Sequence, residues 1–500
     1  MTEHFYGDEE RFRRTMDPET YARIVDDGDL CRLWARSARE YADGTAVVYD
    51  GRSLTYAGLD REIALQRGAL AEAGCRPGER IALLCENSID FVRAFFAVVT
   101  LGGVAAVLPP QLGAEEIADC CRSMELTRLL CQPRLMEKAK AADVPVLSTD
   151  CRAEAEVPAA LPKPDDPCVI VLTGGTTGRR KGALLSHTAV VRGIMNACLC
   201  SEKAFRQRYL LLLPLTHIFG LVRNMLTCVY TGSTLFISKS PKDMIQDLAA
   251  FQPTLVVLVP ALAELALKLR KALGRDVFGP SLKTVVTGAA PTPPYLVEEY
   301  HRLGIRLLPG YGLTEAAGLV SGNDYPLDKP WSVGLPFPEQ ELKLVDGELW
   351  LRGRNLFTRY VGTDESAFTE DGWFRTGDLA RVDEDGFLYL VGRTKEVIKL
   401  SGGESVYPAE LESRFNALPF IRDSEVFEAV ADNGAHILAL EVVLRETETA
   451  RLGPDPAAAA MEALWEVNRA QRPAERVSRI AVRETDFERT PSMKIVRRKL

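Results

Sequence analysis

Leu172-Thr-Gly-Gly-Thr-Thr-Gly-Arg-Arg-Lys-Gly182 holds four glycines, three threonines and one lysine, and it follows the apolar run Val169-Ile-Val-Leu172. A short continuous apolar run of this kind is typical of a buried strand. The loop after it offers backbone N–H groups and hydroxyls, which are the donors that phosphate oxygens accept. The stretch therefore predicts a phosphate-binding loop at the end of a buried strand and points to nucleotide triphosphate chemistry.

The loop does not match the Walker pattern G-x-x-x-x-G-K-[ST]. Arg180 stands five residues after Gly175, and Lys181 is followed by Gly182, so no hydroxyl adjoins the lysine to hold Mg²⁺. A flexible surface turn is the alternative interpretation. The repeated threonines and the preceding buried strand argue against a plain linker, which would favour glycine and serine.

Composition limits the class of protein. The chain has 500 residues, 46% of them hydrophobic and 26% charged, with a net charge of −8. These values predict a soluble globular protein of two to four domains, and the negative charge argues against nucleic acid as its main partner. The 11 cysteines form no C-x-x-C pair, and the N-terminus lacks an apolar signal segment. We expect buried thiols, no membrane insertion and a cytoplasmic location.

Strand and helix patterns alternate from about residue 30 to 330, which predicts parallel sheets in α/β layers. Buried strands are expected at 80–85, 104–108, 209–214, 254–259 and 282–287, with a helix over 90–100. Ligands of such sheets bind beyond the carboxyl ends of the strands. The loop after Leu172 and the turn Gly288-Ala-Ala-Pro291 both stand at such ends.

The pattern changes after about Trp331. Residues 341–345, 348–352 and 387–391 alternate polar and apolar side chains, which predicts short antiparallel strands. The tail mixes strands with helices over 408–416 and 457–469.

Four further segments could serve a nucleotide. Pro309-Gly-Tyr-Gly-Leu-Thr-Glu315 places a tyrosine between glycines, where it can lie against a planar ring, and its Thr-Glu pair could serve phosphate and Mg²⁺. Gly372-Trp-Phe-Arg-Thr-Gly-Asp378 places a carboxylate in an expected tight turn, suited to a ribose diol. The other two are Gly392-Arg-Thr-Lys-Glu-Val-Ile-Lys399 and Arg489-Thr-Pro-Ser-Met-Lys-Ile-Val-Arg-Arg498. Taken singly, each could be an ordinary turn or a solvated strand end.

In their order and spacing, these segments resemble the core motifs of the adenylate-forming ANL superfamily. That superfamily contains acyl- and aryl-CoA synthetases, peptide synthetase adenylation domains and beetle luciferases. The resemblance implies an α/β fold with a large N-terminal AMP-binding domain, residues 1–394, of two doubly wound sheets plus a small β-barrel. It also implies a smaller, mobile α+β domain over residues 395–500, with Lys395 as the hinge.

The resemblance also implies roles for single residues. Thr314 would contact the α-phosphate, Glu315 would bind Mg²⁺, and Lys494 would bridge the substrate carboxylate and the α-phosphate. Lys399 would act in a second, thioester-forming step. Gly312 would line both the nucleotide site and the acid pocket. The remaining nucleotide contacts are the phosphate loop of Thr173, Gly174, Gly175, Thr176, Thr177, Gly178 and Lys181, the adenine bracket of Gly288, Ala289, Ala290, Gly310 and Tyr311, and the ribose pair Asp378 and Arg393.

The acid pocket is expected around Pro214-Leu-Thr-His-Ile-Phe-Gly220, which has no acidic residue to hold an ammonium group. An amino-acid substrate is therefore not expected. His217, Phe219, Arg223 and Asn224 are the pocket candidates. His217 resembles the histidine found there in many acyl- and aryl-CoA ligases, with a packed core histidine as the alternative, whereas Arg223 and Asn224 could equally well face the core or solvent. His187 is expected to be structural.

The resemblance implies ATP and Mg²⁺ as cofactors and an aryl or acyl carboxylic acid as substrate. The acceptor would be CoA, or the phosphopantetheine of a separate carrier protein in natural-product biosynthesis. The chain ends six residues after Lys494, so a free-standing monomer or homodimer is expected. A luciferase-like oxidoreductase and a catalytically dead nucleotide-binding protein are the alternatives from other classes.

This sequence departs from the family pattern at two places. Gly174 stands where the family usually has serine, and Met493 stands where it usually has glycine. We expect both departures to tune the reaction rather than abolish it.

Overall fold

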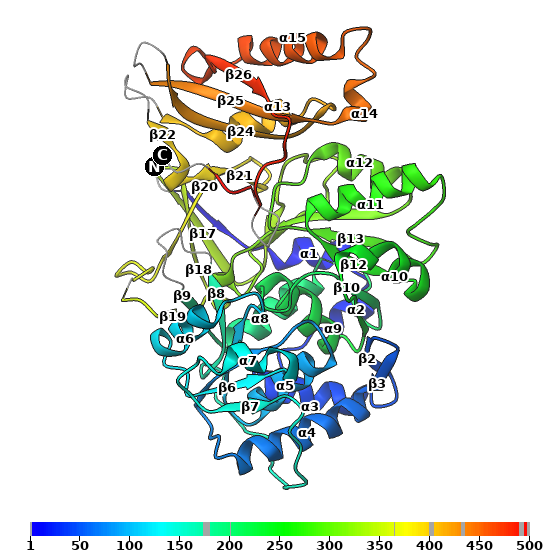
Figure 1. The fold of residues 1–500 in the computed structure, drawn as a ribbon, viewed down its shortest axis with the longest axis vertical. Coiled ribbons are helices and arrows are strands. Elements are labelled where there is room, and N and C mark those ends of the chain that lie inside the picture. Colours follow the sequence, from blue (N-terminus) through cyan, green and yellow to red (C-terminus); the bar gives the residue numbers. More distant parts are fainter. Residues whose placement is uncertain are drawn as a thin grey trace.

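A computed structural model describes residues 3–173, 181–200, 202–364, 366–399, 405–431, 436–489 and 495–497. Two large, mostly parallel sheets and one antiparallel sheet form the body of the molecule, and a smaller C-terminal part lies at the top of Figure 1.

The first large sheet carries the expected phosphate loop. Its strands run in the order β19-β9-β8-β5-β4-β6-β7, and β8, which ends at Thr173, pairs antiparallel with β9, which begins at Lys181. Thr173 is therefore the last residue of a central strand, as the apolar run predicts. The strands are β4 (Arg80–Leu84), β5 (Val104–Leu108), β6 (Arg128–Cys131), β7 (Val146–Ser148), β8 (Pro167–Thr173), β9 (Lys181–Ser186) and β19 (Arg359–Val361).

The second large sheet has the order β16-β15-β14-β13-β12-β10-β11-β2-β3. Its central strands are parallel, and antiparallel strands stand at both edges. The strands are β2 (Thr45–Tyr49), β3 (Arg52–Thr55), β10 (Arg208–Leu211), β11 (Thr234–Ile237), β12 (Leu255–Leu258), β13 (Thr284–Thr287), β14 (Arg306–Tyr311), β15 (Ser321–Gly322) and β16 (Leu335–Pro336).

Helices pack between and around these sheets, and the largest hydrophobic cluster joins residues of both. Helix α5 is the clearest case, because nearly all its side chains are buried, as its apolar sequence predicts. The helices of this region are α1 (Glu9–Thr15), α2 (Pro18–Ala22), α3 (Leu30–Glu40), α4 (Tyr56–Glu72), α5 (Ile89–Thr100), α6 (Ala114–Ser123), α7 (Met136–Ala139), α8 (His187–Cys198), α9 (Thr227–Tyr230), α10 (Met244–Phe251), α11 (Pro260–Leu273), α12 (Pro294–Arg302) and the π-helix η2 (Phe219–Leu226).

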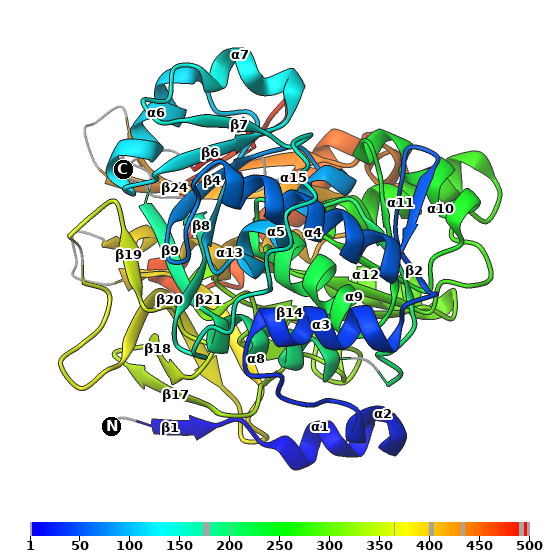
Figure 2. The same ribbon diagram turned by 90° about the horizontal axis from the view of Figure 1, so that it is seen from below.

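A five-stranded antiparallel sheet, in the order β1-β17-β18-β20-β21, corresponds to the expected small β-barrel. The N-terminal strand β1 pairs with β17, far away in sequence, and Figure 2 shows the two side by side. The strands are β1 (Glu3–Tyr6), β17 (Gln340–Val345), β18 (Glu348–Gly353), β20 (Phe374–Val382) and β21 (Leu388–Arg393).

The C-terminal part has a hydrophobic cluster of its own, formed by residues between 398 and 480. Its helix α13 begins and ends where the sequence pattern predicts. The elements are β22 (Ile398–Lys399), β23 (Ser405–Val406), β24 (Ile421–Val430), β25 (His436–Leu444), β26 (Arg479–Val482), α13 (Pro408–Asn416), α14 (Glu446–Thr449) and α15 (Pro456–Arg469).

Two expectations from composition can be compared with this structure. The cysteines are free, and all are buried except Cys151, which is half-buried. None of the described helices combines the length and the apolar character that a membrane crossing requires.

Candidate active site

Three polar side chains meet where the second large sheet borders the antiparallel sheet. The Tyr311 hydroxyl, at the end of β14, donates to Asp378 Oδ2 at 2.5 Å. Arg393 Nε lies 2.8 Å from Asp378 Oδ1, because β20 and β21 pair these two residues in register. The carboxylate expected in a tight turn therefore stands within strand β20. The turn prediction was wrong because Phe374–Val382 is one strand, which pairs with β18 before Gly377 and with β21 from Asp378 onward.

Burial and charge set the protonation of this cluster. Burial, and next the Asp378 carboxylate, raise the pKa of Tyr311 well above its ordinary value. The phenol thus remains a hydrogen-bond donor at neutral pH. The Asp378 charge also raises the pKa of Arg393, so the guanidinium stays positive.

A second cluster surrounds Glu315, in the 3₁₀ turn η4 (Thr314–Ala316). Tyr360 of β19 donates its hydroxyl to Glu315 Oε1 at 2.7 Å. Lys181 Nζ lies 3.8 Å from the centroid of the same tyrosine ring, a cation–π contact. Thr173 Oγ1 donates to the Lys181 backbone carbonyl at 3.4 Å between the paired strands β8 and β9. Tyr360 therefore links the two ends of the predicted phosphate and Mg²⁺ site.

The Glu315 carboxylate fits a hard divalent cation. In the described part of the chain, its Oε2 accepts no hydrogen bond, while Oε1 is held by Tyr360. A carboxylate oriented at one oxygen and open at the other suits Mg²⁺, which prefers oxygen ligands and keeps several waters. Among the described residues, no cluster of three or more His, Cys, Asp and Glu side chains offers another metal site.

A cavity of about 550 Å³, counting its open mouth, lies against the ends of β13 and β14. Predicted pocket and adenine residues share its wall, and Asn224, although buried, does not line it. The wall residues from the predictions are His217, Phe219, Arg223, Gly288, Ala289, Gly310, Tyr311 and Gly312.

Close backbone approach shapes this cavity. A Cβ on Gly312 would lie 1.7 Å from the carbonyl oxygen of Gly318, so no side chain fits there. Ala289 adopts φ 66°, a left-handed conformation that costs a non-glycine residue energy and that clusters at functional sites.

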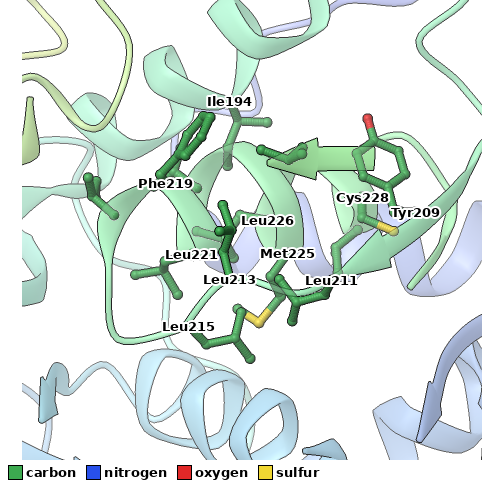
Figure 3. Close-up of a cluster of buried hydrophobic side chains, with 14 of the residues drawn as sticks. Ile194, Tyr209, Leu211, Leu213, Leu215, Phe219, Leu221, Met225, Leu226 and Cys228 are labelled. Atoms are coloured by element: carbon green, nitrogen blue, oxygen red, sulfur yellow. The ribbon is translucent and has the colours of Figure 1, made fainter. Parts of the chain in front are cut away.

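The helix beside the cavity is a π-helix, an unusual geometry that is found frequently at functional sites. Its apolar side chains, among them Phe219, Leu221 and Met225, pack in a buried cluster with Ile194 and Leu211 (Figure 3). This packing holds the polar residues of η2 in fixed positions.

The two histidines of this region differ. His187 is structural, as expected: it begins α8, is buried, and accepts the Leu30 backbone N–H at Nδ1 over 3.2 Å. Burial lowers the pKa of His187 to about 4. His217 lines the cavity, and its Nδ1 accepts the Phe219 N–H at 3.4 Å.

Several predicted residues cannot be placed in this site. Lys494 and the loop residues Gly174, Gly175, Thr176, Thr177 and Gly178 lie outside the described residues. Lys399 belongs to β22, but the structure does not describe its side chain. Lys395 is exposed in the turn η5 (Thr394–Glu396).

Sequence reasoning missed Tyr360, Asp324 and Cys200. Tyr360 stands in a short strand with no distinctive pattern, and Asp324 and Cys200 join the cavity wall from segments far apart in the sequence. Only the fold brings them to the site, so no sequence signal was there to find them.

The model of the AMP-binding enzyme family matches residues 34–361 of this chain. The chain belongs to this family. The AMP-binding family lies within the ANL superfamily of adenylate-forming enzymes. This match confirms the resemblance found in the sequence. The chain is therefore an enzyme of the acid–thiol ligase class.

Named relatives of this AMP-binding enzyme are CoA ligases and synthases. A feruloyl-CoA synthase from an Amycolatopsis species is 32% identical, over 77% of this chain and 82% of the relative. An indoleacetate–CoA ligase from Aromatoleum aromaticum is 30% identical, over 82% and 87% of the two chains.

Solved structures share the fold. The anthranilate CoA ligase AuaEII with anthranoyl-AMP matches with a TM-score of 0.83 at 21% identity, covering 93% of this chain and 95% of that one. The o-succinylbenzoate CoA synthetase of Bacillus subtilis with its acyl-adenylate matches with a TM-score of 0.79 at 23% identity, covering 93% and 96%.

Proposed function

We propose that this enzyme activates a carboxylic acid with ATP and then passes the acyl group to CoA. In the first step a carboxylate oxygen attacks the α-phosphorus, and the bond to pyrophosphate breaks. In the second step the thiol sulfur attacks the acyl carbon, and AMP leaves while the thiol proton goes to solvent. The products are an acyl-CoA thioester, AMP and pyrophosphate.

One observation carries this proposal: Tyr311 belongs to both halves of the site. Its hydroxyl donates to Asp378, the proposed ribose ligand, and the residue also lines the cavity proposed for the acid. A nucleotide held by Asp378 and an acid held in the cavity would therefore meet beside η4. Holding both reactants in line is the main task of such a catalyst, because two anions must be brought together.

The residues supply charge as well as position. Lys181 and Glu315 flank Tyr360 and are proposed to serve the β- and γ-phosphates and Mg²⁺. When bound, Mg²⁺ would neutralise phosphate charge as pyrophosphate departs. Thr314 is proposed to contact the α-phosphate, and Lys494 to neutralise charge between the carboxylate and the α-phosphate.

The two-domain organisation supports this division into steps. We propose residues 1–394 and 395–500 as the two domains, with Lys395 as the hinge and Lys399 acting in the second step. The separate hydrophobic cluster of the C-terminal part supports independent movement of that domain.

Acid-dependent exchange of labelled pyrophosphate into ATP tests the first step. The acids would be ferulate, indoleacetate, 2-succinylbenzoate, benzoates and fatty acids, each followed by CoA and by a carrier protein. We expect exchange with at least one acid and thioester formation with CoA. If a thioester forms only on the carrier protein, CoA is not the acceptor. If no acid supports exchange, the proposed activity is wrong and the chain is a nucleotide-binding protein without it.

A further inference from the structure

Arg223 is a fully buried cation that has no carboxylate partner among the described residues. The buried Tyr209 hydroxyl interacts with it but supplies no balancing charge. The Arg223 side chain has 0% exposure, and Nε and both terminal nitrogens lack a hydrogen-bond partner among the described residues. A guanidinium carries a positive charge and five N–H donors, and each donor needs an acceptor when the group is buried. Buried charges in proteins are normally paired, because leaving water costs them a great deal of free energy.

The chain itself shows what normal pairing looks like. Arg93 is just as buried, but it contacts Glu62 at 2.9 Å, Asp90 at 2.8 Å and the Thr149 carbonyl at 2.8 Å. Arg223 therefore differs from Arg93 in its partners and not in its burial.

Arg223 is one of the residues that line the cavity that we assign to the acid substrate, and neighbouring atoms cover its nitrogens in this structure, so binding requires the cavity to extend toward them. The cavity also contains Asp324, whose carboxylate lies 3.6 Å from Arg306. Among the described residues, no carboxylate approaches Arg223 within ion-pair distance, so Asp324 and Arg306 form one pair and Arg223 stays as one unbalanced positive charge.

We propose that the acid substrate carries a second carboxylate, at the end remote from the group that is activated, and that Arg223 binds it. This inference rests on the proposed function, since it names the class of acid that the same cavity accepts. A second carboxylate supplies the missing charge and matches the planar guanidinium fork with two parallel hydrogen bonds. The first carboxylate would lie at the Gly312 side, next to η4.

Two other ligand classes fit the cavity less well. An uncharged hydroxyl or methoxy group would accept a hydrogen bond and leave the positive charge unbalanced. An amino group would add a second positive charge beside Arg223, and Asp324 is already engaged by Arg306.

Matched acids test the proposal by pyrophosphate exchange. Benzoate and 4-hydroxybenzoate are compared with phthalate, isophthalate and terephthalate, anthranilate is included, and hexanoate is compared with adipate. We expect one dicarboxylate to exceed its monocarboxylate partner by about 100-fold or more in kcat/KM, because a site built for a charged group rejects analogues without it. Arg223→Met should reverse this preference, and Arg223→Lys should keep part of it.

Thermal unfolding gives a readout that does not depend on turnover. Arg223→Met should raise the Tm, because it removes a buried charge that lacks a carboxylate partner. The control Arg93→Met should lower it, because it removes a paired buried charge and leaves Asp90 without its ion pair. The preferred dicarboxylate alone should raise the Tm of the wild-type protein and not that of Arg223→Met.

The possible results distinguish failure of the second-carboxylate inference from failure of the proposed ligase function. Exchange with monocarboxylates, 4-hydroxybenzoate or anthranilate at rates equal to the dicarboxylates would overturn the inference and leave the proposed function standing. Absence of exchange with every acid would overturn the proposed function. A Tm that rises with dicarboxylate equally in wild type and Arg223→Met would overturn the role of Arg223 in either case.

Discussion

At the scale of single residues, the site depends on a few charged groups held by short contacts. Asp378 receives the Tyr311 hydroxyl on one oxygen and the Arg393 guanidinium on the other. Both partners come from elements that the sheets bring together, so the carboxylate has one orientation. Burying a charged carboxylate and holding it in one orientation costs free energy. We attribute this arrangement to ribose binding.

Replacing Asp378 tests that role. Asp378→Asn keeps the shape and removes the charge, and we expect the KM for ATP to rise about 10–100-fold, the value of a hydrogen bond to a charged group. The kcat at saturating ATP should change much less. Asp371→Asn, an exposed carboxylate of the same segment, is the control. Equal KM values for the two variants would contradict the assignment.

His187 gives the fold a dependence on pH. Burial lowers its pKa from 6.5 to about 4. Between these two pH values the imidazole is protonated in the unfolded chain and neutral in the folded chain. Its contribution to the free energy of unfolding is therefore complete above pH 6.5 and is lost as the pH falls toward 4. Between pH 7 and pH 5 the loss should be about 2 kcal/mol.

The variant His187→Asn keeps an acceptor for the Leu30 N–H and does not titrate. Its free energy of unfolding, measured by urea denaturation at pH 7 and pH 5, should fall by about 2 kcal/mol less than that of wild type. His301→Gln, an exposed histidine, should behave like wild type. An unchanged pH dependence in His187→Asn would contradict the interpretation.

At the scale of elements, two arginines that flank Lys494 in sequence are held by carboxylates. Arg489 contacts Asp423 Oδ2 at 2.5 Å, and Arg497 contacts both oxygens of Glu412 at 2.7 and 2.6 Å. Burial raises the pKa of Glu412, and the Arg497 charge opposes this effect. The two contacts tie the described residues that flank Lys494 in sequence to the C-terminal part of the chain.

Arg497→Met removes one of these two contacts. We expect the rate of pyrophosphate exchange to fall about tenfold with an unchanged KM for ATP, because misplacing a catalytic group slows the chemical step. Stability should also fall, since Glu412 is left buried and unpaired. Adding Glu412→Leu should restore stability and not the rate. A double variant with the wild-type rate would show that the contact serves stability alone.

The same scale shows how far sequence reasoning reaches. Strands β4, β5, β12 and β13 follow from their continuous apolar runs, and α13 follows from its period. Asp378 was placed in a turn because glycines at 372 and 377 outweigh a strand signal locally, while the pairing with β18 and β21 that makes the segment a strand does not show in the local sequence. The pairing of β1 with β17 was invisible for the same reason. Long-range pairing, rather than local preference, decided these cases.

At the scale of the whole molecule, Arg445 joins the C-terminal part to helices α11 and α12. Its Nε lies 2.9 Å from Glu264, and its terminal nitrogen donates to the Tyr295 hydroxyl at 2.8 Å. Burial acts to raise the pKa of Glu264, but Arg445 and Lys268 outweigh it, so the pKa is lowered. This contact would hold the two proposed domains in the arrangement of Figure 1.

Arg445→Ala should loosen that arrangement. We expect trypsin to cleave the proposed hinge region, at Arg393, Lys395 or Lys399, at least about three times faster, because local opening becomes less costly. Arg451→Ala, on the exposed side of the same part of the chain, is the control. Equal cleavage rates in both variants would contradict a role of Arg445 in domain contact.

The central claim is that a carboxylate oxygen attacks the α-phosphorus of ATP. An acid that supports exchange, labelled with ¹⁸O in its carboxyl group, is incubated with the enzyme, ATP and CoA, and the phosphate-containing products are measured by mass spectrometry. We predict one ¹⁸O atom in AMP and none in pyrophosphate. Label in inorganic phosphate, with ADP as the nucleotide product, would contradict adenylate formation.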